Sequence, residues 1–312
     1  GVEQRAALRG AREDGRAVHE LVMTATPIPR TIAMTVFGDL DDTRMSGMPS
    51  GRTPVATYLA DSANAAWVER TWARAAEEIA QGRRVYVVCP RIDASDHVAD
   101  AEEENVRPLA SVEEVAAYLR SHPALSGIAI HELTGRTPSP VKAQIMEDFS
   151  TGRAPLLVAT TVIEVGVDVS EATLMVILDA QQFGLAQLHQ LRGRVGRGAD
   201  QSYCILVTSH RLTKETSRRI DIMCETNDGF EIAEADLKLR GPGDLEGTQQ
   251  SGIAFDLKIA DIARDGQIVQ MAREEAQKII DADPDCRKSE YNLLWDRLKA
   301  LRKTNINWAA IS

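Results

Sequence analysis

The apolar residues of this chain fall into short, almost uninterrupted runs, separated by longer segments of helical periodicity. Strands of a parallel sheet are buried on both faces, so they read as continuous runs rich in Val, Ile and Leu. Alternation of such runs with helical segments predicts an α/β fold in which helices cover both faces of a parallel sheet. The expected strands are Leu21–Met23, Val55–Leu59, Val85–Cys89, Ile128–Leu133, Leu156–Ala159, Leu174–Leu178 and Tyr203–Val207.

Helix signals lie between these runs. They are N-cap residues, a capping box and a proline in a first turn, with glycines near two of the helix ends. The expected helices are Ala65–Ala80 (capped by Asp61 or Ser62, with Gly82 after it), Val112–Arg120 (capping box Ser111 and Glu114) and a helix from Pro140 to near Phe149 and Gly152. The apolar face of the first is expected to hold Trp67, Val68, Trp72, Ala75, Ala76 and Ile79.

Two changes of character divide the chain. The segment 39–54 is rich in Gly, Pro, Ser and Asp and is typical of a linker, and the strand–helix alternation ends near Thr208. We therefore expect three parts, 1–50, 51–208 and 209–312. In the last part we expect a basic helix over Ser209–Thr226 (with Arg211, Lys214, Arg218 and Arg219), a glycine-rich segment Gly229–Gly252, and helices over Ile253–Ser312 with Trp295 and Leu298 in their core.

Composition narrows the class of protein. The chain has 312 residues, 44% hydrophobic and 26% charged, which is ordinary for a globular protein. A net charge of -10 argues against a generally basic protein that coats nucleic acid, although a local basic groove is compatible with it. The four cysteines form no C-x-x-C pair, so no metal site or disulfide framework is indicated, and Cys89 and Cys204 are expected to be buried thiols. Without a long apolar run or a signal-peptide pattern, we expect no membrane contact and a cytoplasmic location.

The strongest chemical signal is the segment Gln190–Arg197, which places three arginines and two glycines within eight residues. Arginine is always charged and binds phosphate oxygens through a planar fork, and glycine lets the backbone turn tightly. A solvated basic helix end would not need glycines at fixed spacing. We interpret Arg194 and Arg197 as arginine fingers that reach a nucleotide held mostly by another domain.

Two further segments offer weaker signals. Thr160–Asp168 follows an expected strand and combines threonine hydroxyls, a glycine and a carboxylate that could bind ribose or orient an arginine. Taken alone, it reads equally well as an ordinary connection between a strand and a helix. Thr24–Thr31 is a weaker signal, because a threonine-rich loop stiffened by two prolines is often only a rigid turn. Ligands of parallel sheets bind outside the carboxyl ends of the strands, and we expect each of these segments to lie at that edge.

Together the three segments resemble motifs III, V and VI of superfamily 2 helicases, with Gln190–Arg197 matching motif VI almost residue for residue. The resemblance is closest to the RecG branch-migration helicases. It is carried by Thr24–Thr31, by Phe183–Gly198, and by Gly229–Asp244 with Gly247–Gly252, which are similar to the TRG translocation motif that RecG shares with the transcription-repair coupling factor. The sequences Arg240-Gly-Pro-Gly and Phe183-Gly-Leu-Ala-Gln favour RecG over the coupling factor. Gln249 departs from the arginine that is common in RecG at that position.

This resemblance implies a RecA-like second helicase domain over 51–208, a remnant of the first domain over 1–50, and a mainly helical TRG module over 209–312. It further implies roles for single residues. Arg194 and Arg197 would contact the ATP phosphates with support from Gln190, Gly166 and Asp168 would line the nucleotide cleft, Thr160 and Thr161 would touch DNA, and Thr24, Thr26, Arg218, Arg219, Arg240 and Gln250 would couple ATP hydrolysis to movement.

The resemblance also implies an ATP- and Mg²⁺-dependent enzyme that acts on branched duplex DNA, such as stalled forks and Holliday junctions. We expect it to be a monomer, with single-strand-binding protein as a further partner. The chain contains neither a Gly-Lys nor an Asp-Glu dipeptide, so the P-loop and the D-E-x-H box that hold Mg²⁺ and most phosphate oxygens would lie outside it. We therefore expect the 312 residues to lack ATPase activity on their own. The alternatives are a fragment of the coupling factor and a non-enzymatic DNA-binding module.

Overall fold

The computed structural model describes residues 43, 47, 51–93, 109–164, 168–209, 212–240 and 265–304. The expected strand Leu21–Met23 and nearly all of the expected first part lie outside these residues. The strands are β1 (Ala56–Asp61), β2 (Arg84–Val88), β3 (Ile130–Leu133), β4 (Leu156–Ala159), β5 (Ala172–Ile177) and β6 (Tyr203–Thr208). The α-helices are α3 (Ala65–Ala80), α4 (Val112–Ser121), α5 (Ser139–Thr151), α6 (Leu185–Arg192), α7 (Lys214–Glu225), α8 (Gly229–Arg240), α9 (Gly266–Ala282) and α10 (Asn292–Thr304). Single 3₁₀ turns are η1 (Pro123–Leu125), η2 (Thr161–Glu164), η3 (Ala180–Gln182) and η5 (Ser289–Tyr291).

The six strands form one sheet in the order β1-β6-β5-β2-β4-β3, and every neighbouring pair is parallel. The central strands β2, β4 and β5 are buried along their whole length, as continuous apolar runs predict. The six strands that the sequence predicts within 51–208 are all present, although β3 begins two residues later than expected and β1 ends two residues later. The predicted parallel α/β fold is confirmed.

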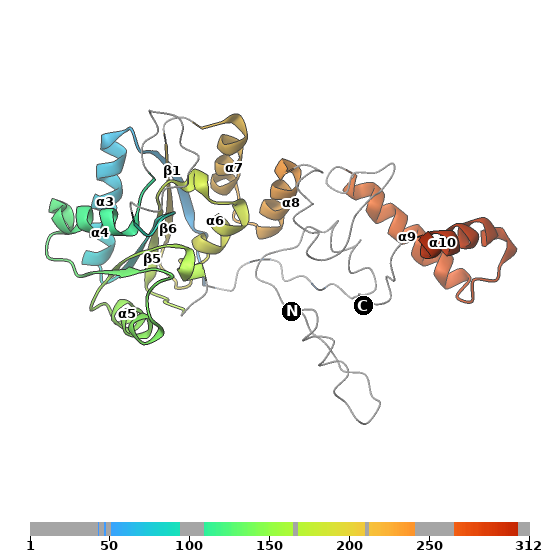
Figure 1. Cartoon of the computed structure of the whole chain (residues 1–312), viewed down its shortest axis with the longest axis horizontal. Helices are drawn as coiled ribbons and strands as arrows, with labels where there is room; N and C mark the ends of the chain where they lie inside the picture. Colours follow the sequence, from blue (N-terminus) through green and yellow to red (C-terminus); the bar gives the residue numbers. More distant parts are fainter. Residues whose placement is uncertain are drawn as a thin grey trace, which may run out of the picture.

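Helices cover both faces of this sheet (Figure 1), and an apolar core lies under the helices on each face. Helices α3 and α4 pack on one face, through residues such as Trp72 and Leu119. Helices α5, α6, α7 and α8 contribute to the other core, through residues such as Phe149, Leu188 and Met223. The segment Gln190–Arg197, called the glycine–arginine segment below, and the first helices of the C-terminal part therefore pack on the same core.

The first helix, α3, has the predicted bounds Ala65–Ala80, but its cap is not one of the two residues that the sequence suggested. Asp61 is the last residue of β1, and the side chain of Asn64 accepts hydrogen bonds from the amides of Ala66 and Trp67 instead. The buried stripe of α3 then runs through Thr71, Trp72, Ala75 and Glu78. Trp67 lies at the edge of this stripe and is 50% exposed, so its predicted place in the core was wrong. Ser111 is confirmed as the N-cap of α4, because its Oγ accepts from the Glu114 amide at 3.3 Å. The Glu114 carboxylate accepts from the Ser111 hydroxyl at 2.7 Å, which differs from the bond to the Ser111 amide that a capping box has.

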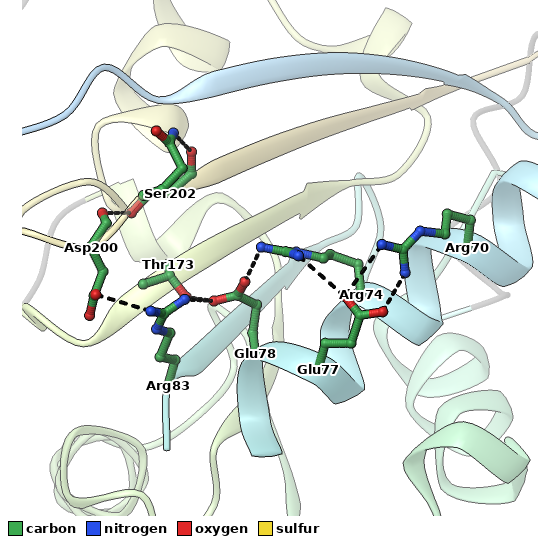
Figure 2. Close-up of polar contacts among 9 residues, drawn as sticks. Arg70, Arg74, Glu77, Glu78, Arg83, Thr173, Asp200 and Ser202 are labelled. Carbon is green, nitrogen blue, oxygen red and sulfur yellow. Dashed lines mark hydrogen bonds and ion pairs between the residues drawn. The ribbon is translucent and has the colours of Figure 1, made fainter. Parts of the chain in front are cut away.

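A buried ion-pair network holds the amino ends of the strands together (Figure 2). Glu78 of α3 is fully buried, and its carboxylate meets Arg74 Nη2 at 2.5 Å and Arg83 Nη1 at 3.0 Å. The hydroxyl of Thr173, near the start of β5, donates to the same carboxylate at 2.5 Å. Arg83 also pairs, at 3.0 Å, with Asp200. Asp200 lies in the loop after Arg197. The network therefore fixes the loop that follows the glycine–arginine segment to the base of the sheet.

The C-terminal part differs from the sequence prediction in three places. The basic helix expected from Ser209 begins at Lys214, with Thr213 as its cap. The glycine-rich segment begins with a regular helix, α8. Before residue 241 its only glycine is Gly229, the first residue of α8, so no glycine interrupts the helix. Of the two residues predicted for the C-terminal core, Trp295 is buried and donates to Asp283 Oδ2 at 2.9 Å, whereas Leu298 is 41% exposed. The predicted place of Leu298 in a core was wrong: among residue 265 and residues 267–300, only Asp283 and Trp295 are buried.

Candidate functional site

The segment Gln190–Arg197 lies on the α6 side of the sheet. Residues Leu185, Leu188, Leu191 and Arg192 form the buried stripe of α6, so the residues that follow the helix are carried across this face. A helix that connects parallel strands must run back along the sheet to reach the amino end of the next strand. The arginines that follow α6 therefore lie near the amino ends of the strands.

This position corrects the expectation that every motif lies at the carboxyl edge. A Cβ added to Gly196 would lie 2.6 Å from Val55, just before β1, and one added to Gly198 would lie 2.7 Å from the carbonyl oxygen of Ser170, just before β5. Both contacts place the turn beside the starts of strands. Thr160 and Thr161 do lie at the carboxyl edge, where the Thr160 amide donates to Leu133 O at 3.2 Å.

The two segments nevertheless meet. Helix α6 packs against η2, which starts at Thr161. Arg197 Nη1 pairs with Asp168 Oδ1 at 3.1 Å, and Arg197 Nε donates to Gly193 O at 3.0 Å. The guanidinium is thus held from two sides while a quarter of the side chain is exposed. A guanidinium held in this way is preorganised, which lowers the cost of binding a phosphate.

Tyr86 of β2 is buried within electrostatic range of these charges. Burial raises the pKa of its hydroxyl to about 12, while the nearby positive charges of Arg194 and Arg197 lower it and Asp168 raises it. All three charged residues therefore lie close enough to one buried phenol to act on it electrostatically. Arg194 is half-buried, and its amide donates to Leu191 O at 3.0 Å in a 3₁₀-type turn that follows α6. Gln190 lies half-buried on the last turn of the same helix.

A cavity of about 450 Å³ opens between α5 and η2. It is lined by Tyr86, Lys142, Met146, Val162 and Ile163, among others. The cavity therefore extends from Tyr86 to the turn that follows Thr160.

Arg218 and Arg219 are neighbours with different surroundings. Arg218 is exposed and pairs with Glu225 of its own helix at 2.9 Å. Arg219 is half-buried, and its Nη2 donates to Gln181 O in η3 at 3.1 Å. Helices α7 and α8 pack against each other and against α6, which is the arrangement of a helical hairpin. Arg240 is the last residue of α8. Thr24, Thr26, Gly166 and Gln250 lie outside the described residues.

Sequence reasoning missed two residues of this region. Arg192 belongs to the glycine–arginine segment but received no role, although its spacing of four from Leu188 places it on the buried stripe of the helix. Tyr86 was read only as part of a strand. No sequence signal distinguishes a tyrosine within electrostatic range of two arginines from an ordinary core residue.

The chemistry of this site suits an anion. Arginine forks bind phosphate oxygens, so Arg194 and Arg197 fit the phosphate groups of a nucleotide. Among the described residues, no group of three His, Cys, Asp or Glu side chains could hold a metal ion. None of the helices within the described ranges is both long and apolar enough to cross a lipid bilayer.

Gly196 offers a test of how the turn positions Arg197. Its φ is +76°, which is unfavourable for residues with a Cβ, and the added methyl would press on Val55. Gly196→Ala is expected to lower the free energy of unfolding by about 1–2 kcal/mol from the backbone conformation alone, plus a further cost from the contact. Gly82→Ala is the matched control, since Gly82 has φ +78° with open space around it. Equal losses in urea denaturation would show that the contact with Val55 contributes nothing.

Comparison with known proteins places these features in a family. Residues 70–199 match the helicase conserved C-terminal domain, and residues 226–312 match the C-terminal part of domain 3 of the ATP-dependent DNA helicase RecG. The ATP-dependent DNA helicase RecG of Bacillus subtilis is 42% identical over 304 residues, which are 96% of this chain and 41% of that protein. RecG of Acidithiobacillus ferridurans is 45% identical over 286 residues, which are 91% of this chain and 39% of the relative.

A solved structure agrees with the sequence matches. The structure of RecG bound to a three-way DNA junction superposes with a TM-score of 0.61 at 37% identity, covering 83% of this chain and 31% of that one. The chain spans about two fifths of the length of the two curated relatives. The fold and both family matches agree: this chain belongs to the RecG family of DNA helicases and carries a RecA-like helicase C-terminal domain followed by the C-terminal part of RecG domain 3.

Proposed function

We propose that this chain is the C-terminal motor portion of an ATP-dependent translocase that remodels branched duplex DNA at stalled forks and Holliday junctions. Arg194 and Arg197 act as arginine fingers on the ATP phosphates, and Gln190 supports them. Gly166 and Asp168 line the nucleotide cleft, while Thr160 and Thr161 contact the DNA backbone. Mg²⁺ and most phosphate ligands come from the preceding helicase domain of the intact enzyme.

The ion pair between Arg197 and Asp168 carries this proposal. It joins a residue that the sequence assigned to phosphate recognition with one assigned to the nucleotide cleft, and the two lie 29 positions apart in the chain. A carboxylate that orients a guanidinium restricts its rotation, so less entropy is lost when the guanidinium meets a phosphate. ATP itself supplies the transferable phosphoryl group, and the protein residues bind it, orient it and stabilise its charge.

Thr160 and Thr161 lie at a different edge of the sheet from Arg197. This separation favours distinct roles for the two ends of the segment 160–168, with DNA at the carboxyl edge and nucleotide near Asp168. Arg218, Arg219, Arg240 and Gln250, together with Thr24 and Thr26, convert nucleotide-driven closure into movement along the duplex. The intact enzyme works as a monomer in the cytoplasm and also contacts single-strand-binding protein.

Two other functions were open at the level of sequence. The match of residues 226–312 to RecG domain 3 favours RecG over the transcription-repair coupling factor. The helicase-domain match over 70–199 favours a motor over a DNA-binding module without catalytic activity.

The proposal is tested with the intact enzyme on a synthetic replication fork and on a linear duplex. We expect ATP hydrolysis that is stimulated by the fork, and unwinding of the fork that requires hydrolysable ATP and Mg²⁺. Fork binding without ATP hydrolysis would instead support the non-enzymatic module.

The 312-residue chain alone is expected to show no DNA-stimulated ATPase activity. Two arginines cannot replace the phosphate cradle and the Mg²⁺ ligands that a motor of this class needs. Phosphate release by the purified chain would be measured with fork DNA and Mg²⁺, beside the intact enzyme as positive control. Magnesium-dependent turnover by the chain that survives a further chromatographic step would contradict this expectation.

A further inference from the structure

Arg192 is buried at the junction of two helices. Its side chain is on the inner face of α6, five positions before Arg197, and the residue is 3% exposed. Its Nη1 donates to the carbonyl oxygen of Met223 at 2.7 Å and to that of Thr226 at 2.9 Å. Both acceptors lie at the carboxyl end of α7. A guanidinium of α6 therefore caps the end of the first helix of the hairpin.

The charge of Arg192 is balanced in an unusual way. Within the described part of the chain, no carboxylate pairs with it. The last carbonyls of an α-helix lack intrahelical partners and carry partial negative charge, so a buried cation is stabilised there. Burial lowers the pKa of Arg192, and it also lowers that of His189, whose neutral Nδ1 can accept from Arg192 Nη2 at 3.3 Å. Because the partners of Arg192 at this helix end are carbonyl oxygens of α7, the guanidinium keeps them only while α7 stays against α6.

Arg192 also reaches the sheet, because its Nη1 lies 3.3 Å from Thr57 Oγ1 in β1. Helix α7 has a second attachment, since Arg219 donates to Gln181 O in η3. Besides the packing of α7 and α8 on α6, side-chain hydrogen bonds therefore hold the hairpin at two points. One is at η3, which follows β5, and the other is at α6, the helix that precedes Arg194 and Arg197. Of these two attachments, only the one through Arg192 starts from the helix that precedes the arginine fingers.

We propose that Arg192 is a positioning residue that makes α6 and α7 move as one body, so that a shift of α6 on nucleotide binding displaces the α7–α8 hairpin. This inference rests on the proposed motor function. In this arrangement Arg192 touches neither ATP nor DNA, and its loss separates hydrolysis from movement without removing either binding site. Lysine cannot replace it fully, because an ammonium lacks the planar fork.

The test compares three variants of the intact enzyme. Arg192→Met removes the donors at similar length, and Arg192→Lys keeps the charge. Arg84→Met is the matched control: Arg84 is likewise buried and donates to helix-terminal carbonyls, those of Phe149 at 2.9 Å and Ser150 at 3.2 Å, but in α5. ATP hydrolysis and fork unwinding are measured in the same reaction.

We expect Arg192→Met to hydrolyse ATP within about 3-fold of wild type but to unwind about 10-fold fewer forks per ATP, in the range of typical coupling strengths. Arg192→Lys should give an intermediate ratio, and Arg84→Met should keep the wild-type ratio. A wild-type ratio in both Arg192 variants overturns the proposal, as does an equal loss in Arg84→Met. If Arg192→Met does not fold, the ratio of Arg192→Lys decides.

Hydrogen exchange of the chain itself separates this inference from the motor function. Arg192→Met should speed exchange of the amides over 222–226 about 10-fold, with β4 and α5 unchanged, whereas Arg84→Met should speed exchange in α5. Unchanged exchange at the end of α7 overturns the link between the helices. If the wild-type enzyme neither hydrolyses ATP nor unwinds forks, the motor function fails and the coupling role falls with it, while the exchange result still decides whether Arg192 joins α6 to α7.

Discussion

Replacing Arg197 with alanine in the intact enzyme is expected to lower ATP turnover by about 10³-fold, the lower end of the effect of arginine fingers. Arg194→Ala should have an effect of similar size. The reason is electrostatic: a preorganised guanidinium stabilises the charge that develops on the transferred phosphoryl group. Arg197 is already held by Asp168 and Gly193 O, so this preorganisation is built into the turn. Steady-state phosphate release at saturating ATP and fork DNA measures the effect.

Fork binding should change little in both variants, because neither arginine is assigned to DNA. Arg120→Ala is the matched control. Arg120 is half-exposed and pairs with Glu132 at 2.7 Å on the opposite side of the sheet, so its loss removes one positive charge and one ion pair without touching the site. Turnover near the wild-type rate in both the Arg194 and the Arg197 variant would rule out their role as arginine fingers.

Glu78→Ala is expected to cause the largest loss of stability, about 3 kcal/mol in the free energy of unfolding. The carboxylate of Glu78 is fully buried between Arg74, Arg83 and Thr173 (Figure 2). Its removal leaves two partly buried guanidinium groups facing a cavity with one counter-charge fewer. The loss stays at the lower end of the range for broken buried pairs, because Arg74 keeps Glu77 and Arg83 keeps Asp200. Urea denaturation of the chain, followed by circular dichroism, measures it.

Glu77 supplies the control for this prediction. It is the adjacent residue, it pairs with Arg70 and Arg74, and its side chain is 44% exposed. Ion pairs in contact with solvent contribute little to stability, so Glu77→Ala should shift the denaturation midpoint far less than Glu78→Ala. Similar shifts in the two variants would mean that burial of the Glu78 carboxylate does not determine its contribution.

Sequence patterns predicted the sheet well because its physical signal is local. Strands buried on both faces must be continuously apolar, and β2, β4 and β5 are. The capping residue of α3 was harder to predict than its bounds, since several polar residues near a helix start can act as its cap. Asp61 is taken up by β1, and Asn64 caps α3 instead. The start of α8 was missed because glycines farther along the segment suggested irregular structure, although 230–240 contains none.

The candidate site was predictable in its residues more than in its geometry. The spacing of glycine and arginine indicated a phosphate site, and Asp168 was already considered as a residue that could orient an arginine. The direction in which α6 runs decides where on the sheet the site lies. A sequence motif carries no information about that direction. The link from Arg192 to the end of α7 joins residues 31 and 34 positions apart, and no local pattern indicates such a contact.

Binding of ADP with aluminium fluoride, an analogue of the phosphoryl-transfer transition state, tests the central claim most directly. An arginine finger acts on the transition state more than on the ground state, so its contribution appears as extra affinity for the analogue. The intact wild-type enzyme should bind ADP with aluminium fluoride more tightly than ADP alone, in the presence of Mg²⁺ and fork DNA. Arg197→Ala should lose most of this difference and keep its affinity for ADP. If Arg197→Ala instead binds the analogue as tightly as wild type does, Arg197 does not complete the nucleotide site.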